Sequence, residues 1–121
     1  MINDRQNLGH LGEQAAISFL KKNGFKILKT NYRTKLAEID IIAKDQTSIC
    51  FIEVKTRRSM KKGLPRESVN YSKQKKIITG AMFYLKEKKL INSKIRFDVI
   101  EVFEENKNFS VNLIKHAFQV S

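Results

Sequence analysis

The chain has 121 residues, of which 41% are hydrophobic and 30% are charged. This length and composition fit one globular domain and exclude an intrinsically disordered chain. The single cysteine, Cys50, excludes an internal disulfide, and no apolar run approaches the ~18 residues of a membrane span. The first residues, MINDRQNLGH, lack the apolar segment of a signal peptide, so we expect a cytoplasmic protein without a membrane partner.

The net charge is the most informative of these quantities. Lysine and arginine number 24 against 12 aspartates and glutamates, which gives a formal net charge of +12. A basic excess of this size is typical of proteins that bind nucleic acid. A solvated surface, an acidic protein partner or an anionic membrane face would be the alternatives.

The first half of the sequence predicts one helix and three strands. Apolar residues at helical spacing indicate a helix from about Asn7 to Asn23, and the glycine that follows would end it. Strands are expected at Phe25–Arg33, Leu36–Ala43 and Ser48–Thr56, and a tight turn at 44–47 would join the last two.

The second half predicts a further helix and one or two strands. The helix would run from around Pro65 to about Lys89, with Ser68 or Ser72 as its N-cap. Lys94–Phe103 is expected to be a strand, and Phe109–Lys115 either a short fifth strand or an extended tail. The order αβββαβ predicts a single α/β domain over residues 1–121, in which helices flank a mixed central sheet.

Charged residues interrupt two strands that should bury apolar side chains, in the segment EIDIIAKDQTSICFIEVKT. Residues two apart in a strand share a face, so Glu38 lies on the face of Asp40, and Glu53 on that of Lys55. A two-residue turn at Asp45-Gln46 would place Asp40 diagonal to Glu53, with Glu38 directly opposite Glu53. A three-residue loop would instead move Asp40 to the other face.

Two converging carboxylates repel each other unless a proton, a lysine or a metal ion offsets their charge. At about 5 Å and an effective dielectric of about 20, the repulsion is roughly 3 kcal/mol. Mg²⁺ is the usual occupant of a small carboxylate site near phosphates. Held by Asp40 and Glu53, it would polarise a phosphate oxygen and lower the pKa of a bound water. Lys55 could orient that water or neutralise charge on the phosphate. The pattern D-x(12)-E-x-K thus outlines a phosphodiester hydrolase site, and an exposed pair of charges on a strand is the alternative.

Basic residues follow the hairpin directly. Arg57, Arg58, Lys61 and Lys62 would line the mouth of this site, and Lys73 lies near the start of the second helix. Contacts from such side chains to phosphates hold a nucleic acid in place without reading its base sequence. A solvated loop is the alternative for the first four residues.

The motifs EIDIIA and FIEVKTR resemble the core of the PD-(D/E)XK nuclease superfamily, which has the restriction-endonuclease-like fold. Along nearly its whole length the chain resembles the YraN family of uncharacterised bacterial proteins. The resemblance is carried in order by GE (12–13), NYR (31–33), AEIDII (37–42), FIEVKTR (51–57), GLP (63–65) with Lys73 after it, RFDV (96–99) and AF (117–118). One departure is Ala37, where the family has glycine.

The resemblance implies an αβββαβ core with its active site on the hairpin, and it assigns Glu13, Asp40, Glu53 and Lys55 to that site. Glu13 would join Asp40 and Glu53 as a metal ligand, although from the sequence alone it is an ordinary glutamate favoured by the helix dipole. The superfamily implies cleavage of DNA that depends on Mg²⁺ or Mn²⁺. Holliday-junction resolvases and restriction enzymes belong to it, and some members only bind nucleic acid.

We therefore predict a Mg²⁺-dependent endonuclease that acts on DNA, with branched, repair or recombination intermediates among its substrates. A nucleic-acid-binding module that keeps the nuclease fold without cleaving is the main alternative. A basic adaptor for a protein or ribosomal partner is a further one. Two cuts on a duplex or junction would favour a homodimer.

Three other residues have expected roles outside the metal site. Glu38 could be a further ligand or could pair with an arginine such as Arg33. Asp98 is expected to be structural, paired with Arg96 or with a helix lysine. Cys50 alternates onto the face opposite Glu53 and is expected in the core.

Overall fold

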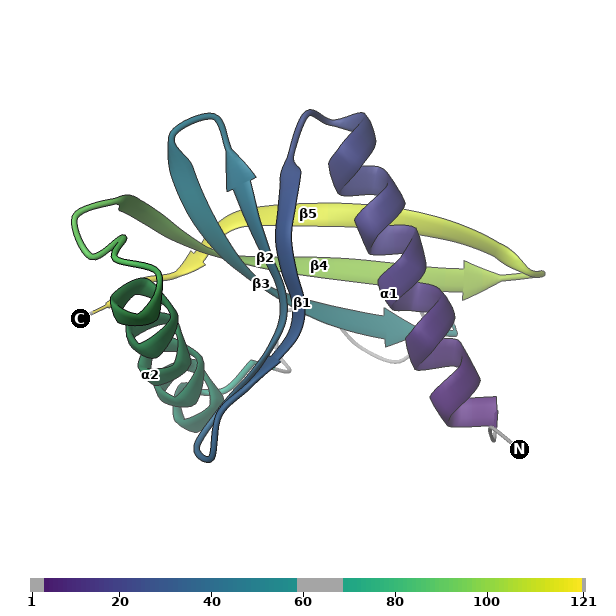
Figure 1. Cartoon of the computed structure of the whole chain (residues 1–121). Coiled ribbons are helices and arrows are strands. Elements are labelled where there is room, and N and C mark those ends of the chain that lie inside the picture. The colour runs from purple at the N-terminus through teal and green to yellow at the C-terminus, as the bar shows by residue number, and fades with distance from the viewer. Residues whose placement is uncertain (1–3, 59–68, 121) are drawn as a thin grey trace.

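The computed structural model describes residues 4–58 and 69–120, which form an α/β fold with one helix on each face of a five-stranded sheet (Figure 1). The elements in chain order are α1 (Asp4–Lys22), β1 (Lys26–Arg33), β2 (Glu38–Asp45), β3 (Ser48–Arg57), α2 (Tyr71–Glu87), β4 (Lys94–Glu105) and β5 (Asn108–Phe118). Among the described residues, no helix is long and apolar enough to cross a membrane.

The strands follow one another across the sheet in the order β1-β2-β3-β4-β5. β3 and β4 run parallel, and the other neighbouring pairs run antiparallel. A parallel pair needs a crossover connection, and the segment that contains α2 supplies it. This mixed sheet with flanking helices confirms the predicted αβββαβ order and is the arrangement that the restriction-endonuclease-like fold implies.

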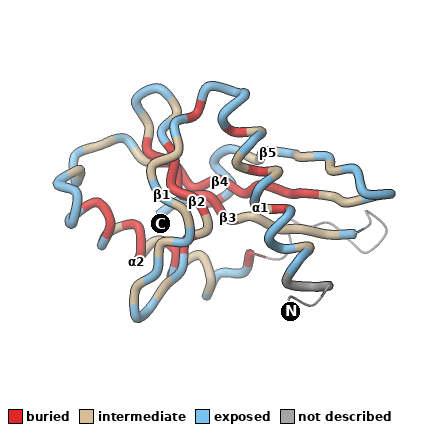
Figure 2. Tube along the Cα trace, turned by 45° about the vertical axis from the view of Figure 1, so that its right-hand side comes forward, coloured by how far each residue is buried: buried red, intermediate tan, exposed pale blue. Residues whose placement is uncertain are grey.

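The core is divided between the two faces of the sheet, and Figure 2 shows its buried residues along the central strands and on the inner sides of both helices. Leu20 of α1 packs with Cys50 and Ile52 on one face. Leu85 of α2 belongs to the cluster of Phe51 on the other. Because side chains alternate along a strand, β3 is buried on both faces. The predicted core position of Cys50 is confirmed, and burial raises the pKa of its thiol to about 12.

Helix α2 differs from the prediction at its N-terminus. It begins at Tyr71, and its N-cap is Asn70 rather than Ser68 or Ser72. The Asn70 Oδ1 accepts a hydrogen bond from the backbone N–H of Lys73 at 2.9 Å. Asparagine caps a helix as well as serine does, so the nearby serines were a misleading signal. The predicted start near residue 65 lies outside the described residues.

Strand β5 settles the alternative that the sequence left open. Asn108–Phe118 is a full edge strand of 11 residues that pairs with β4, not a tail. Asn106 and Lys107 join the two strands, and both have positive φ (51° and 65°). A two-residue turn of this kind matches the twist of a hairpin, but asparagine-lysine is a weaker sequence signal for it than asparagine-glycine.

A buried ion-pair network holds the end of β5 to the sheet. The fully buried Asp98 accepts hydrogen bonds from Arg96 at 2.8–3.0 Å, and Arg96 also reaches Asp45 at 3.0 Å. Asp98 Oδ1 in addition accepts the backbone N–H of His116 at 3.1 Å. The expected pairing of Asp98 with Arg96 is therefore confirmed, and its role is structural.

Replacing Asp98 with alanine is expected to lower the free energy of unfolding by about 3–5 kcal/mol. It removes the carboxylate that accepts three hydrogen bonds from the buried Arg96 guanidinium, which keeps its contact to Asp45. Urea unfolding measures this loss. The control is Glu38→Ala, which breaks the exposed 3.5 Å pair with Arg33 and should cost less than about 1 kcal/mol. Equal losses in the two variants would contradict a stabilising role for the buried network.

Candidate active site on the β2–β3 hairpin

The register of the β2–β3 hairpin differs from the predicted one by two residues. Asp45 pairs with Ser48, so the turn is at Gln46-Thr47 and the predicted turn at Asp45-Gln46 was wrong. A shift of two residues preserves the faces of a strand. The last pair of the ladder is Ile41–Ile52, and Asp40 and Glu53 come directly after it. Asp40 is therefore level with Glu53 rather than diagonal to it, and Glu38 does not lie opposite Glu53.

Asp40 is held against β3 by the backbone. Its Oδ2 accepts a hydrogen bond from the N–H of Val54 at 2.8 Å, which fixes the carboxylate beside that of Glu53. Glu53 is only 6% exposed. Burial, a hydrogen bond with Asp40 and the charge of Asp40 raise the pKa of Glu53 to about 8, against the opposing effect of two lysines. This carboxylate pair holds a proton near neutral pH, or attracts a cation in its place.

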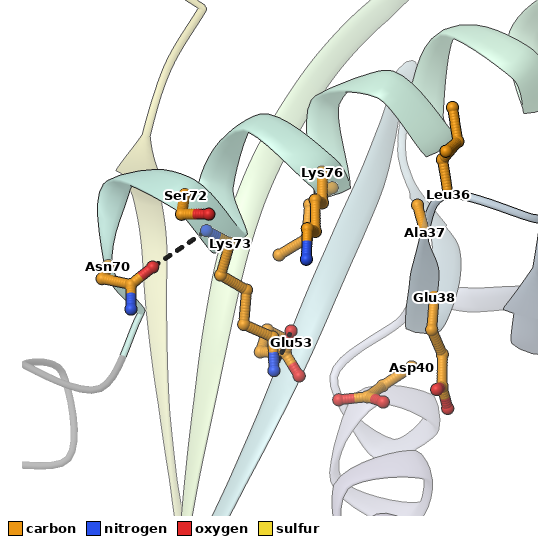
Figure 3. Close-up of a pocket in the computed structure, with 10 residues that line it drawn as sticks. Leu36, Ala37, Glu38, Asp40, Glu53, Asn70, Ser72, Lys73 and Lys76 are labelled. Carbon is orange, nitrogen blue, oxygen red and sulfur yellow. Dashed lines mark hydrogen bonds and ion pairs between the residues drawn. The ribbon is translucent and has the colours of Figure 1, made fainter.

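The two lysines come from different elements. Lys73, in the first turn of α2, places its Nζ 3.4 Å from Glu53 Oε2 (Figure 3). Burial and the Lys73 ammonium lower the pKa of Lys55 on β3. Burial acts to lower the pKa of Lys73, but Glu53 and a hydrogen bond with Lys55 raise it by more. Lys73, predicted as a phosphate contact, thus lies inside the carboxylate site.

A cavity of about 500 Å³ opens in front of these groups, between the start of β2 and the first turns of α2. Asp40 and Glu38 line it from β2, and Glu53 and Lys73 from β3 and α2. In Figure 3, Lys76 extends from α2 toward the space between the two walls. The cavity has both carboxylates and ammonium groups on its surface, which suits a cation bound together with a phosphate.

A second cavity of about 340 Å³ lies toward α1 and shares Asp40 and Glu38 with the first. Glu13 and Asn31 also line it, and Asn31 Nδ2 donates a hydrogen bond to Glu13 Oε1 at 3.0 Å. Burial and the charge of Asp40 raise the pKa of Glu13, while this hydrogen bond lowers it. Asn31 is thus a site residue that sequence reasoning missed. The signal was its place in the NYR motif, and its φ of 51° is one that asparagine tolerates.

Gly12 explains how Glu13 reaches this cavity. Gly12 is buried where α1 crosses β3, and a Cβ at this position would collide with the side chain of Thr56. Only glycine allows this close approach of the helix to the strand. The GE motif therefore combines a packing requirement with a side chain delivered to the site.

Glu13 and Glu53 lie in different cavities, each with Asp40 on its wall. Within residues 4–58 and 69–120, no three Asp, Glu, His or Cys side chains are arranged to hold one metal ion. The expected set of three carboxylates is thus not assembled, whereas the pair of Asp40 and Glu53 is. Mg²⁺ is commonly held by one or two carboxylates, with waters and substrate phosphates completing its shell, so the pair fits this ion.

The other predicted phosphate contacts are distributed around the end of β3. Arg57 is partly buried and close enough to Lys55 to affect its pKa. Arg58 Nη1 lies 3.6 Å from Glu104 Oε2 near the end of β4. Lys61 and Lys62 lie outside the described residues. Of the two roles considered for Glu38, the structure shows the ion pair with Arg33.

Comparison with known proteins identifies the family of this chain. Residues 12–102 match the model of a family described as uncharacterised protein family UPF0102. The chain belongs to this family. It is 50% identical to a UPF0102 protein of Desulforapulum autotrophicum over 119 residues, which are 98% of each chain. It is 48% identical to a UPF0102 protein of Desulfosudis oleivorans over 121 residues, 100% of this chain and 97% of the relative.

UPF0102 is the YraN family that the ordered motifs resemble, so that prediction is confirmed. Among solved structures, the crystal structure of SSO0001 is similar with a TM-score of 0.38 and 22% sequence identity. The similarity covers 93% of this chain and 52% of that one.

Ala37 is the one position at which this UPF0102 protein departs from the family motifs, and the structure shows why alanine is accommodated there. Ala37 does not have positive φ, so glycine is not required there for the backbone. Gly80 of α2 lies against Ala37. A Cβ added at Gly80 would be 3.0 Å from the Ala37 Cβ. Gly80 leaves the room that the alanine methyl group fills.

The carboxylate pair makes the stability of this UPF0102 protein depend on pH. The pKa of Glu53 rises from its ordinary 4.5 to about 8 on folding, so the unfolded chain loses this proton first as pH increases. Stability is therefore expected to fall between pH 4.5 and pH 8, by about 1–3 kcal/mol, and Glu53→Gln should remove this fall. Urea unfolding at several pH values with a chelator measures it.

The matched control is Glu105→Gln, which makes the same chemical change on an exposed side chain near the β4–β5 turn. This variant should keep the pH dependence of the wild type. A Glu53→Gln protein that also keeps the wild-type dependence would show that the carboxylate pair is not its source.

Proposed function

We propose that this UPF0102 protein is a Mg²⁺-dependent endonuclease that hydrolyses phosphodiester bonds, with DNA as its substrate. The observation that carries the proposal is the carboxylate pair of half-buried Asp40 and buried Glu53, which lines an open cavity together with Lys73. Lys55 is close enough to lower the pKa of Glu53. Carboxylates attract a divalent cation, and ammonium groups attract the phosphate that such a cation binds. The net charge of +12 supports a polyanionic substrate.

Asp40 and Glu53 would hold Mg²⁺ or Mn²⁺. When bound, the ion polarises a phosphate oxygen and lowers the pKa of a bound water. The contact between Lys73 and Glu53 supports a cation at this position, because the same carboxylate already accepts one from the protein. Glu13, on the far side of Asp40, would influence the bound ion through Asp40 or through a bridging water.

Asp40, Lys55 and Lys73 would each have a separate role in the reaction. The Val54 N–H keeps Asp40 in place, so this carboxylate needs no rearrangement before it binds a cation. Lys55 is two residues beyond Glu53 on the same face, from which it orients the attacking water. As the water oxygen bonds to phosphorus and the bond to the leaving strand breaks, the Lys73 ammonium neutralises charge on the phosphate oxygens.

Cleavage assays test this proposal on linear duplex, nicked duplex, a four-way junction, single strand and structured RNA, each with Mg²⁺, Mn²⁺ or chelator. We expect metal-dependent cutting of at least one DNA. Glu53→Ala and Lys55→Ala should lower its rate by at least about 100-fold, the effect of removing one preorganised charged group. Lys75→Ala, which removes a lysine that lies over the Tyr71 ring, is the matched control and should keep the rate.

Tight binding without any cutting, unchanged in the Glu53 and Lys55 variants, would contradict the proposal. It would indicate a nucleic-acid-binding module on the same scaffold. Binding whose affinity barely changes with salt would instead favour a basic adaptor for a protein, because phosphate contacts release counterions and depend steeply on salt.

Metal binding can be tested without catalysis. Mg²⁺ at 100 times its dissociation constant should stabilise the wild type by about 2.7 kcal/mol, seen as an increase in Tm. Asp40→Asn should lose this increase, because the amide oxygen can still accept the Val54 hydrogen bond but carries no charge. An unchanged increase in this variant would place the metal elsewhere on the protein.

A further inference from the structure

A third cavity, of about 400 Å³, lies at the sheet edge between β1 and the C-terminal end of α2. This volume is within the range of small-molecule sites, about 300–1,000 Å³. Two tyrosines, Tyr32 of β1 and Tyr84 of α2, line it together with Lys29, Arg33 and Lys88. Of its lining residues, Asn31 alone also lines a cavity of the candidate active site.

The tyrosines form a rigid aromatic wall. The two rings meet edge to face, with 5.3 Å between their centroids and an interplanar angle of 87°. Tyr84 is 4% exposed and belongs to the core, whereas Tyr32 is only partly buried. Burial and the charge of Glu87, which also lines the cavity, raise the pKa of the Tyr32 phenol. The wall is therefore held from behind by the core, and Glu87 lies in the same cavity.

The rim of the cavity is basic. Lys29 and Arg33 on β1 and Lys88 at the end of α2 contribute three positive charges, against the single negative charge of Glu87. An aromatic surface beside cations is the combination with which proteins bind single-stranded nucleic acid, because bases stack on the ring and phosphates contact the cations.

The cavity is next to the candidate active site. Tyr32 pairs with Ile39, the residue before Asp40. Asn31 lines both this cavity and the one that contains Glu13 and Asp40. Neighbouring strands lie about 4.8 Å apart, so one strand width separates the aromatic wall from the Asp40 backbone. A nucleic-acid strand bound at Asp40 would bring a nearby nucleotide to this wall.

We propose that the β1–α2 cavity is a subsite for one unpaired nucleotide of the bound strand, with its base against Tyr32 and its phosphate near Lys29, Arg33 and Lys88. A base inside a duplex is stacked and paired, so it does not enter a side cavity unless it leaves the helix. The substrate class is therefore DNA with an unpaired segment beside the cut, such as an overhang, a flap or an open junction. This inference rests on the proposed function.

The test compares a blunt duplex with the same duplex carrying a three-nucleotide overhang, in chelator, by fluorescence anisotropy. The overhang should tighten binding by about tenfold, as one stacked base does. Lys88→Gln should lower this gain, because it removes one of the three cations near the phosphate while the base still stacks on Tyr32. Lys86→Gln removes the same charge from the last turn of α2, outside the cavity, so it should weaken both DNAs equally and keep the gain.

Equal binding of the two DNAs by the wild type would overturn the subsite, and so would equal effects of the two variants. Metal-dependent cleavage in the same preparation would leave the proposed nuclease standing in either case. If neither DNA binds in chelator, the subsite fails, and the cleavage assays with metal decide the proposed function separately.

Photocrosslinking locates the base without a variant. The chain has three tyrosines, Tyr32, Tyr71 and Tyr84, and Tyr71 is 62% exposed at the start of α2. An overhang that carries 5-iodouracil should crosslink to Tyr32 after irradiation, as peptide mapping would show. Crosslinking to Tyr71 and not to Tyr32 would overturn the subsite.

Discussion

The repulsion between Asp40 and Glu53 is the constraint around which this fold is arranged. Both carboxylates lie where β2 and β3 stop pairing, and Glu53 is buried. A second negative charge beside a buried carboxylate is unfavourable without a compensating proton or cation. The fold supplies partial compensation from two directions: the Val54 N–H reaches Asp40 from β3, and Lys73 reaches Glu53 from α2. Helix α1 adds Glu13 on the far side of Asp40.

The family motifs separate into those that build the site and those that hold the sheet. Gly12 and Asn31 act on Glu13, one by allowing the approach of the helix and the other by a hydrogen bond. The RFDV and AF motifs act beside the N-terminal half of β3, where Arg96, Phe97 and Asp98 pair with residues 50–52. There Asp98 binds Arg96 and the backbone of β5, and Phe97 and Phe118 stack with their centroids 5.1 Å apart. The family motifs therefore meet two different physical requirements: some position the site residues, and others stabilise the sheet.

Periodicity predicted the faces of β3 correctly, because alternation in a strand depends on the local backbone alone. The register of the hairpin depends on which two residues adopt the turn, and Gln46 with its φ of 57° carries no strong sequence signal. The pairing of Asn31 with Glu13 joins residues 18 positions apart and depends on how α1 crosses the sheet. Such distances are tertiary information that propensity and spacing do not contain.

The acidic residues of this basic protein are used in two ways, and the difference bears on function. Asp45, Asp98 and Glu104 form ion pairs with arginines, which neutralise them. Asp40 and Glu13 instead accept hydrogen bonds from uncharged amides, which orient a carboxylate without cancelling its charge. A chain with a net charge of +12 thus keeps negative charge, held in place by dipoles, beside two lysines. Under the proposed function, that arrangement would attract a divalent cation and a polyanion to the same cavity, which a uniformly basic surface would not do.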